Sequence, residues 1–207
     1  LLPDAGLIDY GKSMYGIEFN IRKLDYLYNP RKGVSFCVNG AVGRRKIIKN
    51  AKADESFYEG MEMRTSNYRL AADLMGFVPL HKRFVLVLGL NGGTMFGNKL
   101  YLNELFRIGG MNSLQGFDEK ALYCSSYAIA HAELRFLFAR RSYINAFFNA
   151  AWYERNIPNN YFRDLPFGFG LGLSFDTKAG MFYLSYALGH QHNSPVSFKT
   201  GKIHFGV

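Results

Sequence analysis

Alternation of apolar with small or polar side chains, with a period of two, is the feature that most constrains this chain. Between Phe167 and Asp176 the odd-numbered residues are all Phe or Leu, whereas the even-numbered ones are three glycines, a serine and an aspartate. Successive side chains of a β-strand point to opposite faces, so this segment has one apolar face and one nearly bare face. Because glycine normally weakens a strand, Gly168, Gly170 and Gly172 predict that something packs closely against the bare face.

Eight further segments repeat the alternation, which predicts nine strands and an all-β chain. They lie at 15–22, 34–39, 68–74, 84–91, 131–138, 144–152, 182–188 and 202–207. The connections alternate between short (29–33, 80–83, 139–142, 177–180) and longer (44–65, 96–122, 154–166, 189–196). Tight turns at one end and longer loops at the other are typical of an antiparallel up-and-down transmembrane β-barrel, and a soluble sandwich has no reason to sort its loops in this way.

The alternation by itself fits both a soluble barrel, with its apolar face inside, and a membrane barrel, whose apolar face meets lipid. Several segments reach the length of about ten residues that tilted membrane strands need. Aromatic residues near strand ends (Tyr15, Tyr143, Trp152, Tyr153) fit an interfacial girdle. A mean hydropathy of -0.10 and the lack of an apolar run of about 18 residues exclude a transmembrane helix but leave a membrane barrel open.

The net charge of +9 is compatible with nucleic acid or with the phosphates of membrane lipids as a partner. Much of the excess lies between Arg44 and Lys52. We interpret this basic run as a solvated loop in preference to a binding patch.

Residues 105–117, with the sequence LFRIGGMNSLQGF, resemble the signature of the Omp85 superfamily, in which a Gly-Gly pair precedes Arg-Gly-Phe or Arg-Gly-Tyr. Further resemblances follow in the family's order at 24–33 (LDYLYNPRKG), 132–136 (AELRF), 147–152 (FFNAAW), 168–189 and 201–206 (GKIHFG). The resemblance covers nearly the whole chain and is to the surface-antigen D15 type, which includes BamA- and TamA-like assembly factors. The signature residues in this chain are Gly109, Gly110, Leu114, Gln115, Gly116 and Phe117.

The resemblance implies an outer-membrane barrel of about sixteen strands, of which residues 1–207 would be the C-terminal portion. It also implies that the extracellular loop at about 96–122 folds back into the barrel lumen. Nine strands alone would leave an open sheet with an exposed edge. We therefore expect a fragment or ordered remnant of a longer protein, which would carry the first strands and N-terminal POTRA domains.

Two residues depart from the family pattern together: Gln115 replaces an Arg and Asn149 replaces an Asp. In the family, that Arg reaches inward-facing acids on two neighbouring strands, and a buried charge without a partner is costly. We expect Gln115 to anchor the loop through hydrogen bonds to Asn149 and Glu133, with Arg135 balancing the Glu133 charge. The alternative is that Gln115 is a lumen-facing polar residue without a partner.

The resemblance also implies that the last strand forms a seam that opens toward lipid. Gly201 and Gly206 are expected to weaken its pairing. The family's terminal aromatic residue is replaced by Val207, so either Phe205 serves instead or the true terminus lies beyond.

No HExxH, Walker or GxSxG motif is present, and His190 and His192 have no third metal ligand at a suitable spacing. We therefore expect neither an enzyme nor a cofactor. The resemblance implies an assembly factor that inserts and folds β-barrel proteins into the bacterial outer membrane. Its expected partners are the lipid bilayer with its lipopolysaccharide, client β-barrels, and periplasmic or lipoprotein accessory subunits, but not nucleic acid.

Three other functions stay open: a two-partner-type secretion pore for a dedicated passenger, the barrel of a patatin-like lipase fusion, and a soluble β-sandwich binding module. The first two would differ from an assembly factor in the domains that precede the barrel. A soluble binding module would need no detergent.

Overall fold

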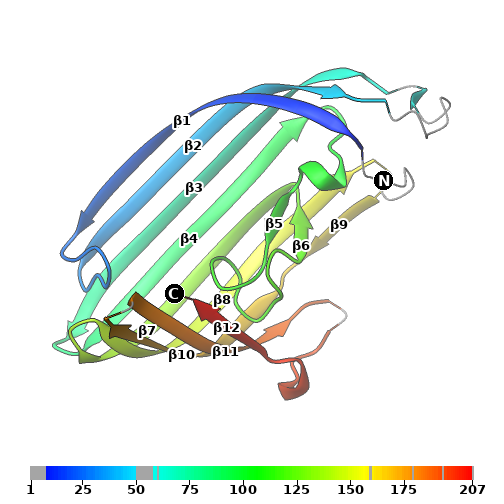
Figure 1. Cartoon of the computed structure of the whole chain (residues 1–207). Coiled ribbons are helices and arrows are strands. Elements are labelled where there is room, and N and C mark those ends of the chain that lie inside the picture. The colour runs from blue at the N-terminus through cyan, green and yellow to red at the C-terminus, as the bar shows by residue number, and fades with distance from the viewer. Residues whose placement is uncertain are drawn as a thin grey trace.

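The computed structural model describes residues 8–49, 58–59, 61–158, 160–178, 180–192 and 194–206. Within this part of the chain, ten strands form one antiparallel sheet. Their bounds are β1 (Tyr10–Leu24), β2 (Gly33–Ile47), β3 (Arg64–His81), β4 (Phe84–Gly97), β7 (Ser126–Ala139), β8 (Ser142–Ile157), β9 (Asn160–Asp164), β10 (Phe167–Thr177), β11 (Gly180–His190) and β12 (Lys202–Gly206). The sheet is strongly curved, as Figure 1 shows.

Neighbouring strands of the sheet follow one another along the chain, in the order β1-β2-β3-β4-β7-β8-β10-β11-β12. These nine strands are the nine segments that the alternation predicts, and the up-and-down topology is confirmed. The sheet does not close on itself, since β1 and β12 lie at its two edges. Within the described residues, no helix is both long and apolar enough to cross a membrane.

Two of the predicted long connections are partly strand. Residues Arg44–Ile47 belong to β2, where all four pair with β1 and the first three also pair with β3. The connection at 154–166 is largely a hairpin, because β8 continues to Ile157 and β9 folds back on it. The extensions carry polar side chains, because the parts of strands that lie beyond the bilayer need no apolar face. A search for apolar alternation therefore does not detect them.

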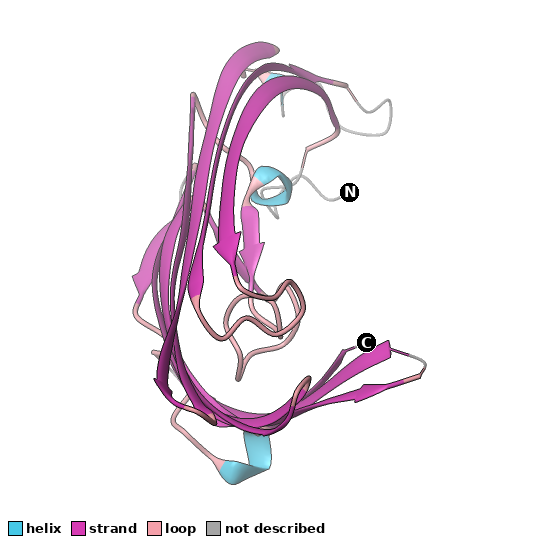
Figure 2. Cartoon of the chain, turned by 90° about the vertical axis from the view of Figure 1, so that its left-hand side faces the viewer, coloured by secondary structure: helices cyan, strands magenta, loops and turns pink. Residues whose placement is uncertain are grey.

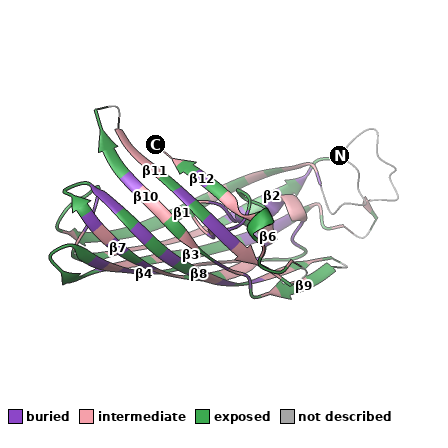
Figure 3. Ribbon diagram, turned by 90° about the horizontal axis from the view of Figure 1, so that it is seen from below, coloured by how far each residue is buried: buried purple, intermediate pink, exposed green. Residues whose placement is uncertain are grey.

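The apolar face of the wall points outward. Leu171 is 68% exposed and Leu90 is 59% exposed, whereas Glu133 on the opposite face is only 6% exposed. Bands of buried and exposed residues alternate along the strands in Figure 3. An exposed apolar surface that runs over a whole sheet is incompatible with a protein in water, so the outer face is the one that meets lipid.

The inner face is polar in its middle and apolar near both ends. Near the short turns, a buried cluster comprises Phe77, Val85, Val87, Leu137 and Tyr143. The expected aromatic girdle is therefore half wrong: Tyr143 and Tyr153 are buried inside, whereas Tyr15 and Trp152 are exposed. Position near a strand end does not decide which face a side chain occupies.

The long connection between β4 and β7 lies on the concave side of the sheet (Figure 2). We call residues 98–125 the lumen loop. It contains the 3-10 turn η3 (Leu102–Glu104) and a two-stranded sheet of β5 (Phe106–Ile108) and β6 (Leu122–Cys124). Its apolar side chains, including the fully buried Leu114 and Cys124, pack with Ile129, Ala151 and Tyr153 of the wall. The loop is thus a folded element with its own share of the core.

Candidate functional site

The Gly-Gly pair and the Gly-Phe pair of the lumen loop form a compact turn. Gly109, Gly110 and Gly116 all have positive φ, which L side chains adopt only with strain. The turn is closed by hydrogen bonds from the Gly110 N–H to the Leu114 carbonyl (3.1 Å) and from the Gly109 N–H to Ser113 Oγ (2.8 Å). The glycines are therefore required by the backbone path of the turn.

This turn rests directly on glycines of the wall. A Cβ at Gly168 would overlap the carbonyl oxygen of Gln115, and a Cβ at Gly189 would overlap that of Gly116. The close packing predicted for the bare face of β10 is thus present at Gly168. Gly170 and Gly172 are instead covered by side chains of the wall, including Phe147.

The same turn contacts the last strand. His204 on β12 accepts a hydrogen bond from the Gly116 N–H through Nε2 (3.3 Å), and Lys202 pairs with Asp118 (Nζ–Oδ1 2.7 Å). Gly206 lies against Met111 of the loop. β12 pairs with β11 over five residues, whereas β10 and β11 pair over eleven. The lumen loop therefore contacts β12 at Lys202, His204 and Gly206.

The predicted seam residues lie at different places. Phe205 points outward from β12 and is exposed, and Gly206 is the last residue of the strand. Gly201 precedes the strand and packs against Tyr186. Val207 lies outside the described residues.

Beside the loop, the inner wall holds a buried charge cluster. Glu133 accepts hydrogen bonds from Arg135 Nε (2.9 Å) and Nη2 (3.1 Å), and it also contacts His131 Nε2 at 3.3 Å. The Arg135 guanidinium lies over the rings of Tyr143 (4.5 Å) and Phe77 (5.6 Å). A bidentate pair of this kind satisfies both charges on the lumen side.

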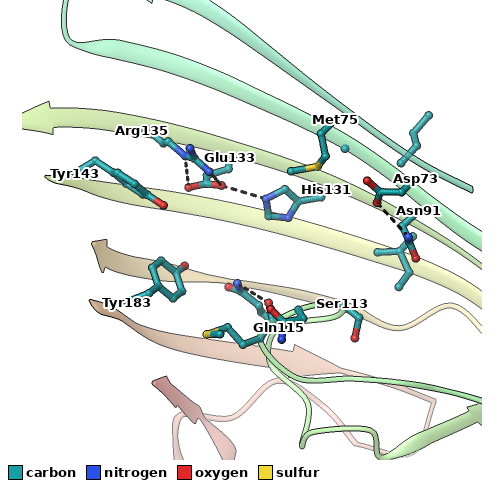
Figure 4. A pocket seen from close by; sticks show the side chains of 15 residues that line it. Asp73, Met75, Asn91, Ser113, Gln115, His131, Glu133, Arg135, Tyr143 and Tyr183 are labelled. Carbon is teal, nitrogen blue, oxygen red and sulfur yellow. Dashed lines mark hydrogen bonds and ion pairs between the residues drawn. The ribbon is translucent and has the colours of Figure 1, made fainter. Parts of the chain in front are cut away.

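A cavity of about 350 Å³ separates this cluster from the tip of the lumen loop (Figure 4). Gln115 and Ser113 line it from the loop, and Glu133 and Arg135 line it from the wall. A second polar pair faces it, in which Asn91 donates to Asp73 (3.1 Å). The described residues include no group of three His, Cys, Asp or Glu side chains placed to hold a metal ion.

The other half of the lumen loop is attached by a buried carboxylate. Glu104 in η3 pairs with Arg45 of β2, accepts a hydrogen bond from Asn67 Nδ2 of β3 (3.0 Å), and lies 3.7 Å from Lys12 Nζ of β1. The Arg45 guanidinium also donates to the Lys99 carbonyl (3.0 Å). One acidic side chain thus ties the loop to three strands.

The expectation that the basic run is a solvated loop is wrong for Arg45, which is 1% exposed. Lys52, at the end of that run, lies outside the described residues. The burial of Arg45 could have been inferred from the alternation of β2, because Gly43, Arg45 and Ile47 share its inward face. A cation at an inward position predicts a buried acid, but Glu104 is too distant in sequence to be named as that acid.

A family model described as the Omp85 superfamily domain matches residues 8–207. The chain belongs to the Omp85 superfamily. No curated protein shows a significant match to it. Members of this superfamily are bacterial outer-membrane proteins that insert or export other proteins, which agrees with the outward apolar face of the wall.

The structure does not contain the hydrogen bonds from the Gln115 side chain to Asn149 and Glu133 that were expected from the resemblance to the Omp85 signature. Gln115 Nε2 donates to the Met111 carbonyl within the loop (3.3 Å), and no described residue donates a hydrogen bond to its Oε1. Glu133 is instead satisfied by Arg135 and His131. The backbone of Gln115, not its side chain, makes the contact with the wall.

Asn149 is fully buried, and neither polar atom of its side chain has a hydrogen-bond partner among the described residues. It is directly opposite Gly168 in the register of β8 and β10, so it lies beside the point where the loop backbone meets the wall. The two departures from the Omp85 pattern are therefore neighbours in space without being bonded to one another. Sequence comparison located the contact region correctly but assigned it the wrong atoms.

Proposed function

We propose that this chain is the barrel portion of an outer-membrane assembly factor that inserts and folds β-barrel proteins. The observation that supports the proposal is the contact of β12 with the signature turn of the lumen loop, through the His204–Gly116 hydrogen bond and the Lys202–Asp118 ion pair. If the seam beside β12 opens, as we propose, the strand presents N–H and C=O groups with which an incoming strand can pair. By contacting β12 from the inside, the lumen loop keeps this strand ordered until a client strand pairs with it.

This function needs no covalent step, and we propose that the protein is neither an enzyme nor dependent on a cofactor. The outer face contributes contact with the lipid bilayer, including lipopolysaccharide in the outer leaflet. Client β-barrels are the substrates, and periplasmic or lipoprotein subunits are the expected accessory partners. Nucleic acid has no role in this proposal.

Depletion of the full-length protein in its native host is the first test. The abundance of all outer-membrane β-barrels is then measured by quantitative proteomics and by heat-modifiable migration. A general loss of folded barrels supports the assembly function. Loss of one secreted protein with unchanged barrels overturns it in favour of an export pore, and no change in either overturns both.

A second test asks whether clients pair with β12. Ile203 on β12 and Leu171 on β10 are outward residues with similar exposed fractions, 73% and 68%. Each is replaced by cysteine in turn, Ile203→Cys or Leu171→Cys, together with Cys37→Ser and Cys124→Ser, and labelled with a maleimide photocrosslinker. We expect client adducts at Ile203→Cys and few at Leu171→Cys, because both edges of β10 are already occupied. Equal adducts at both positions contradict the proposal.

A further inference from the structure

The four tight turns carry a concentration of positive charge at one end of the wall. The β1–β2 turn and its flanks contribute Lys23, Arg31 and Lys32. The other three turns contribute Lys82, Arg83, Arg140, Arg141 and Lys178. Two acids, Asp25 and Asp176, lie among these eight cations, which leaves six of the protein's nine net positive charges at this end. We call this set of eight cations the basic rim.

The two acids of the rim offset only two of its eight positive charges. Asp25 accepts hydrogen bonds from three backbone N–H groups of its own turn, and Asp176 pairs with Arg141 alone (3.5 Å). At the long-loop end, by contrast, cations such as Arg45 and Lys202 are paired with acids of the lumen loop. The charge of the rim therefore faces outward and is available to a partner.

The rim begins where the lipid-facing surface ends. Phe138 is the last large outward apolar residue of β7, and Arg140 and Arg141 follow it after Ala139. Leu80 and Phe84 flank Lys82 and Arg83 in the same manner. Long cationic side chains just beyond a hydrocarbon surface reach the depth of the lipid phosphates.

One part of the rim also has the form of a binding site. A cleft of about 500 Å³ lies between the β1–β2 turn and the β7–β8 turn, lined by Tyr26, Asn29, Arg140 and Arg141 among others. Arg140 donates to the Tyr26 hydroxyl (2.8 Å) and lies over its ring (5.2 Å). Asn29 is buried; its Oδ1 accepts a hydrogen bond from Arg135 Nη1 (3.4 Å), and its Nδ2 has no partner within the described part of the chain. The cleft thus offers two guanidinium groups and a hydroxyl, with one carboxylate, Asp176, paired with Arg141, and its remaining positive charge suits a phosphate.

Aromatic and aliphatic side chains beside this cleft favour a lipid over a soluble anion. Tyr26, Leu27 and Tyr28 are all exposed at the tip of the β1–β2 turn. Large apolar residues at such a tip are unfavourable in water and favourable at a membrane interface, where tyrosine is enriched. We propose that the basic rim binds anionic phospholipid headgroups of the leaflet that it meets, with a lipid phosphate held in the cleft by Arg140 and Arg141. This inference depends on the membrane placement of the wall and is independent of the assembly function.

The test uses the full-length protein from its native membrane, purified in a neutral detergent. Its unfolding temperature is measured by heat-modifiable migration with added phosphatidylglycerol, phosphatidylcholine or inorganic phosphate. We expect phosphatidylglycerol to raise the unfolding temperature, because a ligand that binds only the folded state stabilises it. The variant Arg140→Gln/Arg141→Gln should lose at least half of this rise.

Arg44→Gln/Lys46→Gln is the matched control, since it removes two exposed cations at the opposite end of the wall. It should keep the full response. If Arg140→Gln/Arg141→Gln does not fold, Lys82→Gln/Arg83→Gln at the neighbouring turn serves in its place and should show a smaller rise than the control. An equal response in control and rim variants overturns the proposal. So does an equal rise with inorganic phosphate alone, which would identify a site for a soluble anion.

Discussion

The two halves of the lumen loop are attached to the wall by different physical means. The η3 half is held by one buried carboxylate, Glu104, which pairs with Arg45 of β2. The signature half is held by its backbone, which lies against Gly168 and Gly189 of the late strands. The first attachment depends on a charge, and the second depends on the absence of side-chain atoms.

The difference determines how each attachment fails. Removing one partner of a buried ion pair leaves the other charge desolvated and unpaired, so the ionic attachment is lost by deletion. A close backbone contact has no side chain to delete and is lost by addition of atoms. Backbone packing stands at Gln115, where the resemblance to the Omp85 signature implied a side-chain anchor, and the buried ion pair of the loop lies in its other half, whereas the Lys202–Asp118 pair of the signature half is exposed.

Cys124 gives a natural reporter for both attachments. It is fully buried in β6, and burial raises the pKa of its thiol to about 12. The thiol is therefore inert while the loop is docked, because the thiolate is the reactive form. With Cys37→Ser as the background, the alkylation rate of Cys124 in membranes measures how often the loop leaves the wall.

The largest effect is expected for Glu104→Ala. Arg45 would remain buried without its partner, which costs about 3–5 kcal/mol. The unfolding temperature should fall, and the alkylation of Cys124 should become faster. The double variant Glu104→Ala/Arg45→Met removes both charges and should recover part of the loss; if it is no more stable than Glu104→Ala, the attachment is not ionic.

A smaller effect is expected for Gly168→Ala, because the added methyl group overlaps the Gln115 carbonyl oxygen. Overpacking of this kind typically costs about 1–3 kcal/mol. Faster alkylation of Cys124 is the expected readout. Gly40→Ala is the control, since a Cβ there meets only Leu70 at an ordinary distance of 3.8 Å. A similar rate in the two variants would mean that the turn does not rest on Gly168.

Gln115→Ala should have less effect still. The hydrogen bond that the side chain makes to the Met111 carbonyl lies within the loop, and such a bond contributes about 0.5–1.5 kcal/mol. Stability and the alkylation of Cys124 should both stay close to those of the unchanged protein. A loss as large as that of Glu104→Ala would restore Gln115 as the main anchor and break the comparison.

The smallest effect concerns Asp25, which is remote from both attachments. Burial raises the pKa of this carboxyl, but N–H donors of Tyr26, Arg31 and Lys32 outweigh it and hold the pKa below its ordinary value of 3.8. The stabilisation is complete above the unfolded-state pKa and is lost as the pH falls through the lower folded-state pKa. Asp25→Asn should remove this acid-dependent decline in unfolding temperature; an identical profile in the variant would contradict the assignment.

The sequence was informative wherever one residue's neighbours in the chain decide its surroundings. The alternation located all nine strands of the main path, because every second side chain of a strand points to the same face. It also identified Gly168 as a position where something must approach closely. The alternation could not identify the Gln115 carbonyl as the partner, because every residue has a backbone carbonyl and the residue type does not show which one makes the contact.

Side-chain partners were the part that the sequence described poorly. The replacement of a charged residue by Gln115 suggested a substitute hydrogen bond to Glu133, yet Glu133 is occupied by Arg135. Arg45 was taken for a loop residue, although the register of β2 turns it inward to Glu104. Both errors concern pairs whose members lie on different strands or in a long loop, so that only three-dimensional proximity identifies them.

By itself, then, the sequence determined an up-and-down antiparallel sheet with short connections at one end, and its motifs pointed to the Omp85 superfamily. The tertiary structure decided which face of the wall is buried, how each half of the lumen loop is attached, and that β12 contacts that loop. The physical reason is the sequence separation of the residues involved. The alternation of side chains and the choice of turn residues depend on close neighbours in the chain, whereas burial and ion pairing depend on which distant segments the curvature of the sheet brings together.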